Sequence, residues 1–214
     1  LDYPVVSGNV SFYNETKDKG IKPTPSIGGV GLIKNYKKMI SMGLKEEGNL
    51  ILVIGKTEGH LEQTIFAREI ISEKKGPPPE INLFNEKNNG LTVSKLIKDN
   101  LIESCHDISL GGILVAASKM CVKSNKGMKI NNLKNLMNKF EYFFSEDQGR
   151  YLVEINKDNF KKVEKVLIDN SVHFDELGVV NNDKILFSDE ISLSIEDLIK
   201  AYKSWLKKYM VNWW

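Results

Sequence analysis

The chain has few of the residues from which metal centres and disulfide frameworks are built: two cysteines and three histidines among 214 residues. Cys105 and Cys121 are far apart and form no CxxC pair. We expect two buried, reduced thiols in a cytosolic protein, and the three histidines add too few ligands to the cysteines for a zinc site.

Long apolar runs and a strong net charge are also absent. No apolar run approaches the roughly 20 residues that cross a bilayer, and no secretory signal is present. The formal net charge is +2, which gives no electrostatic reason to expect nucleic acid as a partner. The composition therefore predicts a globular cytoplasmic protein with no membrane partner and no nucleic-acid partner.

What the sequence does contain begins near its amino end. Val5–Tyr13 and Ser26–Ile33 are rich in β-branched and apolar residues and predict two strands around a turn broken by glycine and proline. The chain starts at Leu1 and leads straight into the first of these strands. Domains seldom begin so abruptly, so we expect the carboxy-terminal piece of something longer.

The apolar run Asn49–Gly55 predicts a third strand, buried on both faces. A domain boundary is expected just before it, giving residues 1–45 and 46–214. Proline-rich Lys74–Glu80 predicts an extended linker. The further elements expected are helices over Glu62–Ser72, around Val93–Leu101, over Ile113–Val122 with Ser109 as its cap, around Phe160–Leu167 and around Ile195–Leu206, and strands at Glu141–Phe144, Arg150–Ile155, Val179–Val180, Ile185–Phe187 and Ile191–Leu193. Strands and helices intermix without a regular βαβ period, which favours an α+β fold over a Rossmann sheet.

The first predicted strand carries Gly8, Asn9 and Ser11 at a spacing suited to a nucleotide and a metal ion. Residues 9 and 11 of a strand project from one face. The amide oxygen of Asn9 suits Mg²⁺, the hydroxyl of Ser11 can bind a phosphate or a substrate oxygen, and Gly8 lets a nucleotide lie against the backbone. The alternative is a strand with polar residues on its solvent face.

Three further segments could bind an anion or a metal. Glu58–Leu61 precedes a helix, His106–Gly112 combines an Asp, a Ser and two glycines at a helix start, and Ser145–Arg150 is a polar turn between two expected strands. Each also has a simpler interpretation: a plain turn, tight packing of a helix on a sheet, and ordinary turn chemistry. In the last segment, Arg150 could clamp a phosphate or pair with Glu146.

Together these segments resemble the synthetase subunit of phosphoribosylformylglycinamidine synthase. PVVSGNVSFYNE, PTPSIGGVGLI, HDISLGGILVA and FSEDQGRYLV occur in the order of that family and at its approximate spacing, and the resemblance covers essentially the whole chain. It implies a fold like that of aminoimidazole ribonucleotide synthetase, in which an α/β domain is followed by an α+β domain. Residues 1–45 would end the first domain of the family's second tandem copy, and residues 46–214 would be its second domain.

The resemblance also implies a reaction and its site. The family uses ATP and Mg²⁺ to phosphorylate an amide oxygen of formylglycinamide ribonucleotide, and ammonia from a glutaminase subunit or domain displaces the phosphate. A small accessory subunit accompanies some members. Carried over residue by residue, Gly8 lies against ATP, Asn9 ligates Mg²⁺ and Ser11 contacts the substrate. The family's catalytic residues lie in the first copy, so this chain is expected to be inactive alone.

Two positions depart from the family pattern. Glu62 stands where relatives have glycine, and Leu110 replaces an acidic residue. Both weaken a phosphate-binding role for the second domain. Two alternatives remain: a non-catalytic scaffold half that holds a structural nucleotide, or another member of the aminoimidazole ribonucleotide synthetase superfamily.

Overall fold

The computed structural model describes residues 1–73, 75–131, 137–188 and 192–211. The chain divides into two compact units, unit 1 (Leu1–Lys37) and unit 2 (Lys38–Trp214). This division falls a few residues before the boundary expected at residue 45, and the assignment of residues 1–45 and 46–214 to two family domains stays a prediction.

Unit 1 contains one short hairpin, formed by β1 (Glu15–Thr16) and β2 (Lys19–Gly20). The two predicted strands, Val5–Tyr13 and Ser26–Ile33, are wrong: both segments lie outside regular secondary structure and are exposed throughout. A strand exists only where a neighbouring strand takes its backbone hydrogen bonds, and unit 1 supplies none to these segments. Apolar sequence alone therefore did not make them strands.

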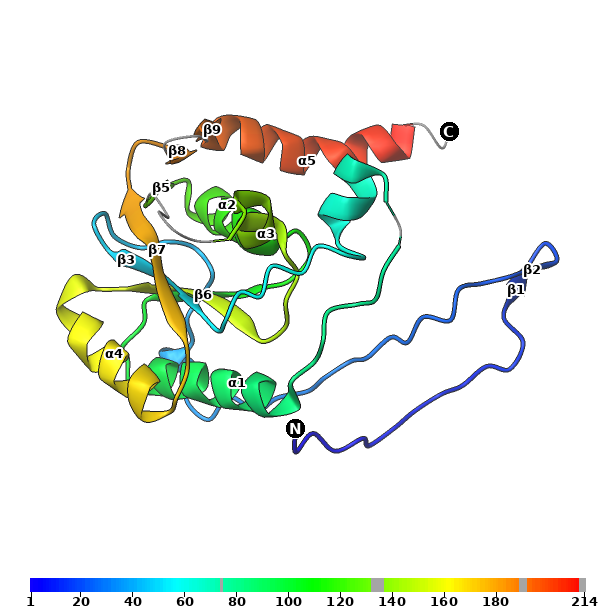
Figure 1. The fold of residues 1–214 in the computed structure, drawn as a ribbon, viewed down its shortest axis with the longest axis horizontal. Helices are drawn as coiled ribbons and strands as arrows, with labels where there is room; N and C mark the ends of the chain where they lie inside the picture. Colours follow the sequence, from blue (N-terminus) through cyan, green and yellow to red (C-terminus); the bar gives the residue numbers. More distant parts are fainter. Residues whose placement is uncertain (74, 132–136, 189–191, 212–214) are drawn as a thin grey trace. The chain divides into compact units, whose positions relative to one another are not determined.

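Unit 2 is built on a seven-stranded sheet in the order β4-β6-β3-β7-β5-β8-β9 (Figure 1). Neighbouring strands are antiparallel except for the parallel pair β5 and β8. The strands are β3 (Leu50–Ile54), β4 (Ser104–Ile108), β5 (Gly127–Ile130), β6 (Arg150–Ile155), β7 (Phe174–Asn181), β8 (Ile185–Phe187) and β9 (Ser192–Ser194). A mainly antiparallel sheet with helices confirms the predicted α+β class.

Helices cover both faces of this sheet (Figure 1). They are α1 (Leu83–Lys98), α2 (Gly112–Ser124), α3 (Lys139–Phe144), α4 (Phe160–Asp169) and α5 (Ile195–Val211). Unit 2 also has single turns at Ala67–Ile71 (π-helical) and Lys157–Asn159. A further turn, Tyr36–Lys38, lies where the two units join in the sequence. Strand β3 alternates between the two faces: Ile51 and Val53 join the core under α2, whereas Leu52 and Ile54 join the core under α1 and α4. The prediction that this strand is buried on both faces is confirmed.

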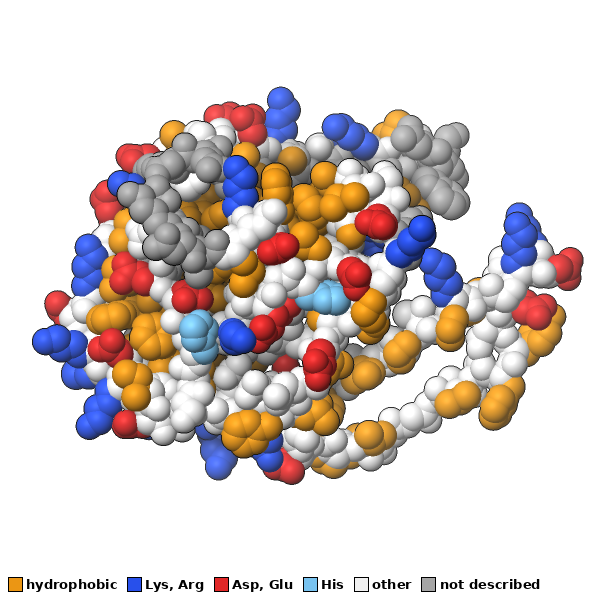
Figure 2. Space-filling view, viewed as in Figure 1, with side chains coloured by type: hydrophobic (Ala, Val, Ile, Leu, Met, Phe, Trp, Pro, Cys, Tyr) orange, Lys and Arg blue, Asp and Glu red, His pale blue; other side chains and the backbone are white. Residues whose placement is uncertain are grey.

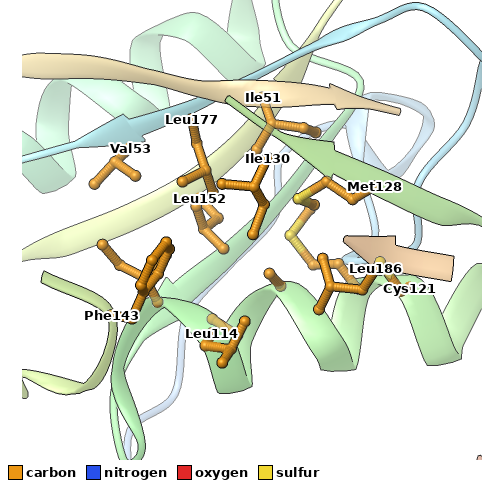
Figure 3. Close-up of a cluster of buried hydrophobic side chains, with 14 of the residues drawn as sticks. Ile51, Val53, Leu114, Cys121, Met128, Ile130, Phe143, Leu152, Leu177 and Leu186 are labelled. Atoms are coloured by element: carbon orange, nitrogen blue, oxygen red, sulfur yellow. The ribbon is translucent and has the colours of Figure 1, made fainter. Parts of the chain in front are cut away.

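The core under α2 includes side chains from β3, β5, β6, β7 and β8 (Figure 3). Leu114 and Cys121 of α2 belong to this core together with Met128, Ile130 and Leu186 of the sheet. Burial raises the pKa of the Cys121 thiol to about 12, so this thiol is neutral at ordinary pH and acts as a small apolar side chain.

The strand predicted at Glu141–Phe144 is wrong, because these residues form most of α3. The Asn138 side chain caps this helix by accepting a hydrogen bond from the Phe140 backbone N–H at 2.8 Å. The helix stacks Phe144 on Phe66, with ring centroids 4.7 Å apart. The cap and the aromatic contacts decided the conformation over the strand preference of aromatic residues.

The cap predicted for α2 is also wrong. The N-cap residue is Gly111, with φ +85°, in place of Ser109. As a glycine it has no side chain that could form a capping hydrogen bond. The next residue, Gly112, has φ +70°, and a Cβ placed there would lie 2.6 Å from the Phe143 carbonyl oxygen. The two glycines therefore let the helix start directly against α3.

Candidate functional site

The predicted nucleotide and metal residues lie in unit 1. Gly8, Asn9 and Ser11 occupy an exposed, extended segment. A Cβ added to Gly8 would meet no atom within 4 Å, and the Asn14 side chain donates a hydrogen bond to the Ser11 carbonyl oxygen at 2.6 Å. Their side chains are thus presented to solvent, and the described residues of unit 1 place no second group of ligands beside them.

Unit 2 brings the other three predicted segments together. The loop Thr57–Leu61 follows β3, the segment Ser109–Gly111 follows β4, and the turn Ser145–Gly149 precedes β6. Since β6 pairs with both β3 and β4, all three segments meet at one edge of the sheet. The sequence treated them as separate candidates, and sheet pairing is the information that it lacked.

Asp147 in the turn occupies the anion site expected at the segment Glu58–Leu61. Its Oδ2 accepts hydrogen bonds from the backbone N–H groups of Glu58 at 2.9 Å and Gly59 at 3.1 Å. Its Oδ1 accepts one from His60 at 3.2 Å. Three successive N–H groups form a concave nest that binds a negative group. Here the protein's own buried carboxylate occupies the nest, so a phosphate has no place in it.

Glu146 fills the second expected anion site, at the start of α2. Its Oε1 accepts hydrogen bonds from the backbone N–H groups of Gly111 and Ile65, both at 2.8 Å. The carboxylate also interacts favourably with the positive end of the α2 dipole. The sequence singled out the glycines correctly as opening backbone N–H groups to an anion, but it did not predict that the anion comes from the neighbouring turn.

Arg150 serves the same turn and does not reach a ligand. It is 1% exposed, and its guanidinium donates to the Thr57 hydroxyl at 3.0 Å and to the Ser145 carbonyl oxygen at 2.7 Å. Burial lowers its pKa, and the Asp147 carboxylate, 3.8 Å away, opposes that shift. Of the two roles expected for Arg150, phosphate clamp and partner of Glu146, the structure shows neither, because Arg150 is buried against Asp147 instead.

Two polar cavities adjoin the turn, of about 220 and about 520 Å³. Glu86 of α1 and Gln148 line both, and Glu86 Oε2 is buried without a hydrogen-bond partner. Burial, followed by the charge of Glu86, raises the pKa of Tyr151 in the smaller cavity. Carboxylates and amides line both cavities, and Lys56 and His60 also line the larger one. The polar wall of the smaller cavity suits hydroxyl or cationic groups.

Asp107 lines the smaller cavity, and His106 precedes it on β4. Their side chains lie 3.0 Å apart, from Nδ1 to Oδ1, and the His106 side chain is 14% exposed. No nucleophile of the described residues is hydrogen-bonded to His106 Nε2, which is buried without a partner. The pair is therefore not assembled as a catalytic acid and base. Among the described residues, no group of three or more His, Cys, Asp or Glu side chains could hold a metal ion.

Comparison with known proteins identifies a family whose members share most of unit 2. Residues 46–189 match the family described as "AIR synthase related protein, C-terminal domain". The matched range contains β3 to β8 and the whole turn with its two carboxylates.

Similar proteins of known name share the full length of the chain. The phosphoribosylformylglycinamidine synthase subunit PurL of Pelagibacter ubique is 62% identical over 99% of the chain, and that of Bartonella bacilliformis is 40% identical over 99%. The chain spans only 29% of the length of each of these relatives.

Solved structures share the fold. The chain is similar to Thermotoga maritima PurL complexed with FGAR, with a TM-score of 0.65 and 16% identity over 76% of this chain and 30% of that one. The same protein complexed with ATP gives 0.60 at 16% identity, over 76% and 27%. Escherichia coli HypE gives 0.51 at 14% identity, over 72% of this chain and 51% of that one. At these identities the likeness concerns the fold alone.

Proposed function

Because residues 46–189 place the chain in the family of AIR synthase related proteins, C-terminal domain, we propose that it forms part of a phosphoribosylformylglycinamidine synthase. The longer protein would convert formylglycinamide ribonucleotide to its amidine in purine biosynthesis, with ATP and with ammonia from glutamine. Support comes from the 62% identity over nearly the whole chain to a subunit of that name.

The observation that decides which unit could contact a nucleotide is the turn Ser145–Gly149 of unit 2. Asp147 and Glu146 take up the backbone N–H groups that could have held a phosphate. The exposed segment Gly8–Ser11 remains as the place where this chain could meet a nucleotide. We therefore assign nucleotide contacts to unit 1 and a supporting role to unit 2. In this proposal unit 1 contributes to the active site of the enzyme, and unit 2 acts as a non-catalytic scaffold.

Each residue of that segment has a proposed role. Gly8 lies against ATP, since nothing occupies the space where a side chain would be. Asn9 supplies one neutral oxygen to Mg²⁺, and Ser11 donates its hydroxyl to the ribonucleotide. A single amide oxygen fits a magnesium ion that keeps waters and phosphate oxygens as its other ligands; when bound, the ion would neutralise charge on the phosphoryl group.

The reaction balances without a further co-reactant. The glycinamide carbonyl oxygen of the ribonucleotide takes the terminal phosphoryl group of ATP, and ADP leaves. Ammonia then adds to the amide carbon that carries this oxygen. Phosphate leaves with the oxygen, so that a C–N bond replaces the C–O bond at this carbon. A glutaminase subunit or domain would supply the ammonia, a small accessory subunit would take part, and the protein would act in the cytoplasm. No helix among the described residues is both long enough and apolar enough to cross a membrane.

The test compares Ser11→Ala with Ser26→Ala in the longer protein, assayed with ATP, ammonia and the ribonucleotide. Loss of one substrate hydrogen bond should raise KM for the ribonucleotide about tenfold and leave KM for ATP unchanged. Ser26 is equally exposed in unit 1, and its variant should behave as wild type. The isolated chain should give no turnover. Turnover by the isolated chain, or an unchanged KM in Ser11→Ala, would contradict these assignments.

A further inference from the structure

Helix α5 continues its apolar stripe beyond the part of unit 2 on which it packs. Ile195 is fully buried, and Leu198 and Ile199 pack against the core. The same helical face then carries exposed side chains over the next 14 Å or so, at 1.5 Å per residue: Tyr202, Trp205, Leu206, Tyr209 and Met210 are between 44% and 72% exposed. A stripe at this spacing marks a face that packs against something.

A groove opens where the packed part of this stripe, at Leu198, meets its exposed part, at Tyr202. Its volume is about 490 Å³, and α2 forms one wall while α5 forms the other. The inner face of α2 packs on the sheet, as Leu114 and Cys121 show in Figure 3. Its outer face presents Val115, Ser118 and Val122, spaced for one side of a helix, to the groove. Leu198 and Tyr202 face them from α5.

The charged residues that line the groove are both basic. Lys119 and Lys123 line it, and no carboxylate is among the lining residues. The exposed half of α5 adds Lys203, Lys207 and Lys208, whereas Glu196 and Asp197 lie in its first turn. Figure 2 accordingly shows both basic and acidic side chains along the edge where Figure 1 places this helix. An occupant that brings negative charge to the borders of the apolar strip is favoured over one that does not, because it complements these ammonium groups.

We propose that the groove between α2 and α5, with the exposed stripe of α5, docks an amphipathic helix of another protein segment whose apolar face is flanked by carboxylates. Its apolar residues enter the groove beside Val122 and Tyr202, and its carboxylates meet Lys119 and Lys123. This is the helix-in-groove mode of recognition, in which apolar anchors recur every three or four residues.

Two other occupants fit less well. A second copy of the chain, paired antiparallel through the exposed half of α5, would oppose Lys203, Lys207 and Lys208 to the same lysines of its partner, and like charges repel. An anionic bilayer would attract the lysines, but a flat surface cannot enter a groove that lies between two helices.

The test uses synthetic peptides of about 18 residues, long enough to form a helix. The first has leucines at helical spacing flanked by glutamates, the second has lysines in place of the glutamates, and the third is a scrambled version of the first. Fluorescence anisotropy of each labelled peptide is measured against the chain. The glutamate peptide should bind about tenfold tighter than the other two.

The variant pair sharpens this test. Lys119→Glu with Lys123→Glu should reverse the preference, so that the lysine peptide binds tighter. Lys161→Glu with Lys165→Glu makes the same change at the same spacing on exposed positions of α4 and should leave the preference unchanged. Circular dichroism of all variants confirms that they fold. Equal binding of the three peptides, unaltered preference in the first variant, binding to phosphatidylserine vesicles in place of peptide, or self-association blocked by Leu206→Asp would each overturn the proposal.

Discussion

Single carboxylates organise the loops of unit 2. Glu154 is completely buried in β6 and accepts hydrogen bonds from the backbone N–H groups of Lys45 and Glu46, from the Asn49 amide and from the Ser104 hydroxyl, all at 2.8–3.0 Å. Since a buried charge is stable only when its hydrogen bonds are satisfied, this one residue fixes the chain that leads into β3.

Glu154→Gln should therefore destabilise the fold. The side-chain NH₂ of glutamine would face N–H groups that now donate to the carboxylate, and these buried N–H groups would lose their acceptor. We expect the free energy of unfolding to fall by about 2–4 kcal/mol. Urea denaturation at neutral pH measures it. The matched control is Glu176→Gln on β7, where the side chain is exposed, and its effect should stay within about 0.5 kcal/mol. Equal stability of the two variants would contradict the role given to Glu154.

The two thiols make stability depend on alkaline pH. Burial raises the pKa of Cys105 and of Cys121 from 9.0 to about 12, with a smaller contribution from Asp107 at Cys105. Between pH 9 and 12 the unfolded chain loses these protons while the folded chain keeps them. Stability is therefore full below pH 9 and falls above it, by about 1.4 kcal/mol per pH unit for each thiol.

Cys121→Ala should reduce that slope. The variant is less stable at pH 8 because its cavity costs packing energy, but its free energy of unfolding should fall less steeply between pH 9 and 11. Urea denaturation under reducing conditions at several pH values gives both slopes. Identical slopes in the variant and in wild type would show that Cys121 does not titrate as described.

At the scale of elements, the start of α2 is the most constrained point of unit 2. Gly112 has φ +70°, and a Cβ there would also lie 2.7 Å from the Ser145 carbonyl oxygen. Gly112→Ala should cost about 2–4 kcal/mol, since both the backbone conformation and the contact with α3 oppose a side chain. The control variant is Gly8→Ala, because no atom lies within 4 Å of a Cβ at that position. Circular dichroism measures the unfolding midpoint of both variants. A midpoint for Gly112→Ala equal to that of this control would refute the packing argument.

Elements with a strong local pattern were predictable from the sequence. The buried run of β3 and the apolar stripes of α4 and α5 appear where the pattern placed them. Glu141–Phe144 was not, because its capping Asn138 and its stacking on Phe66 depend on local competition and on tertiary contact. The turn Ser145–Gly149 was found as a motif, but the destination of its carboxylates depends on the pairing of β6 with β3 and β4, which no local pattern encodes.

At the scale of the whole molecule, the two units divide the proposed work. Unit 2 satisfies its own backbone N–H groups with Asp147 and Glu146 and stands as a packed domain with two apolar cores. Unit 1 exposes its apolar side chains, with Val6 93% and Phe12 101% exposed. Such exposure is typical of a surface that another polypeptide covers, which agrees with a chain that spans 29% of its similar relatives.

The most direct test of this account is the magnesium dependence of ammonia-driven turnover by the longer protein carrying Asn9→Ala. If Asn9 is a ligand, the Mg²⁺ concentration at half-maximal rate should rise about 10- to 100-fold, and Asn35→Ala, an exposed amide elsewhere in unit 1, should leave it unchanged. A half-maximal Mg²⁺ concentration in Asn9→Ala equal to that of wild type would contradict the assignment of the metal contact to unit 1.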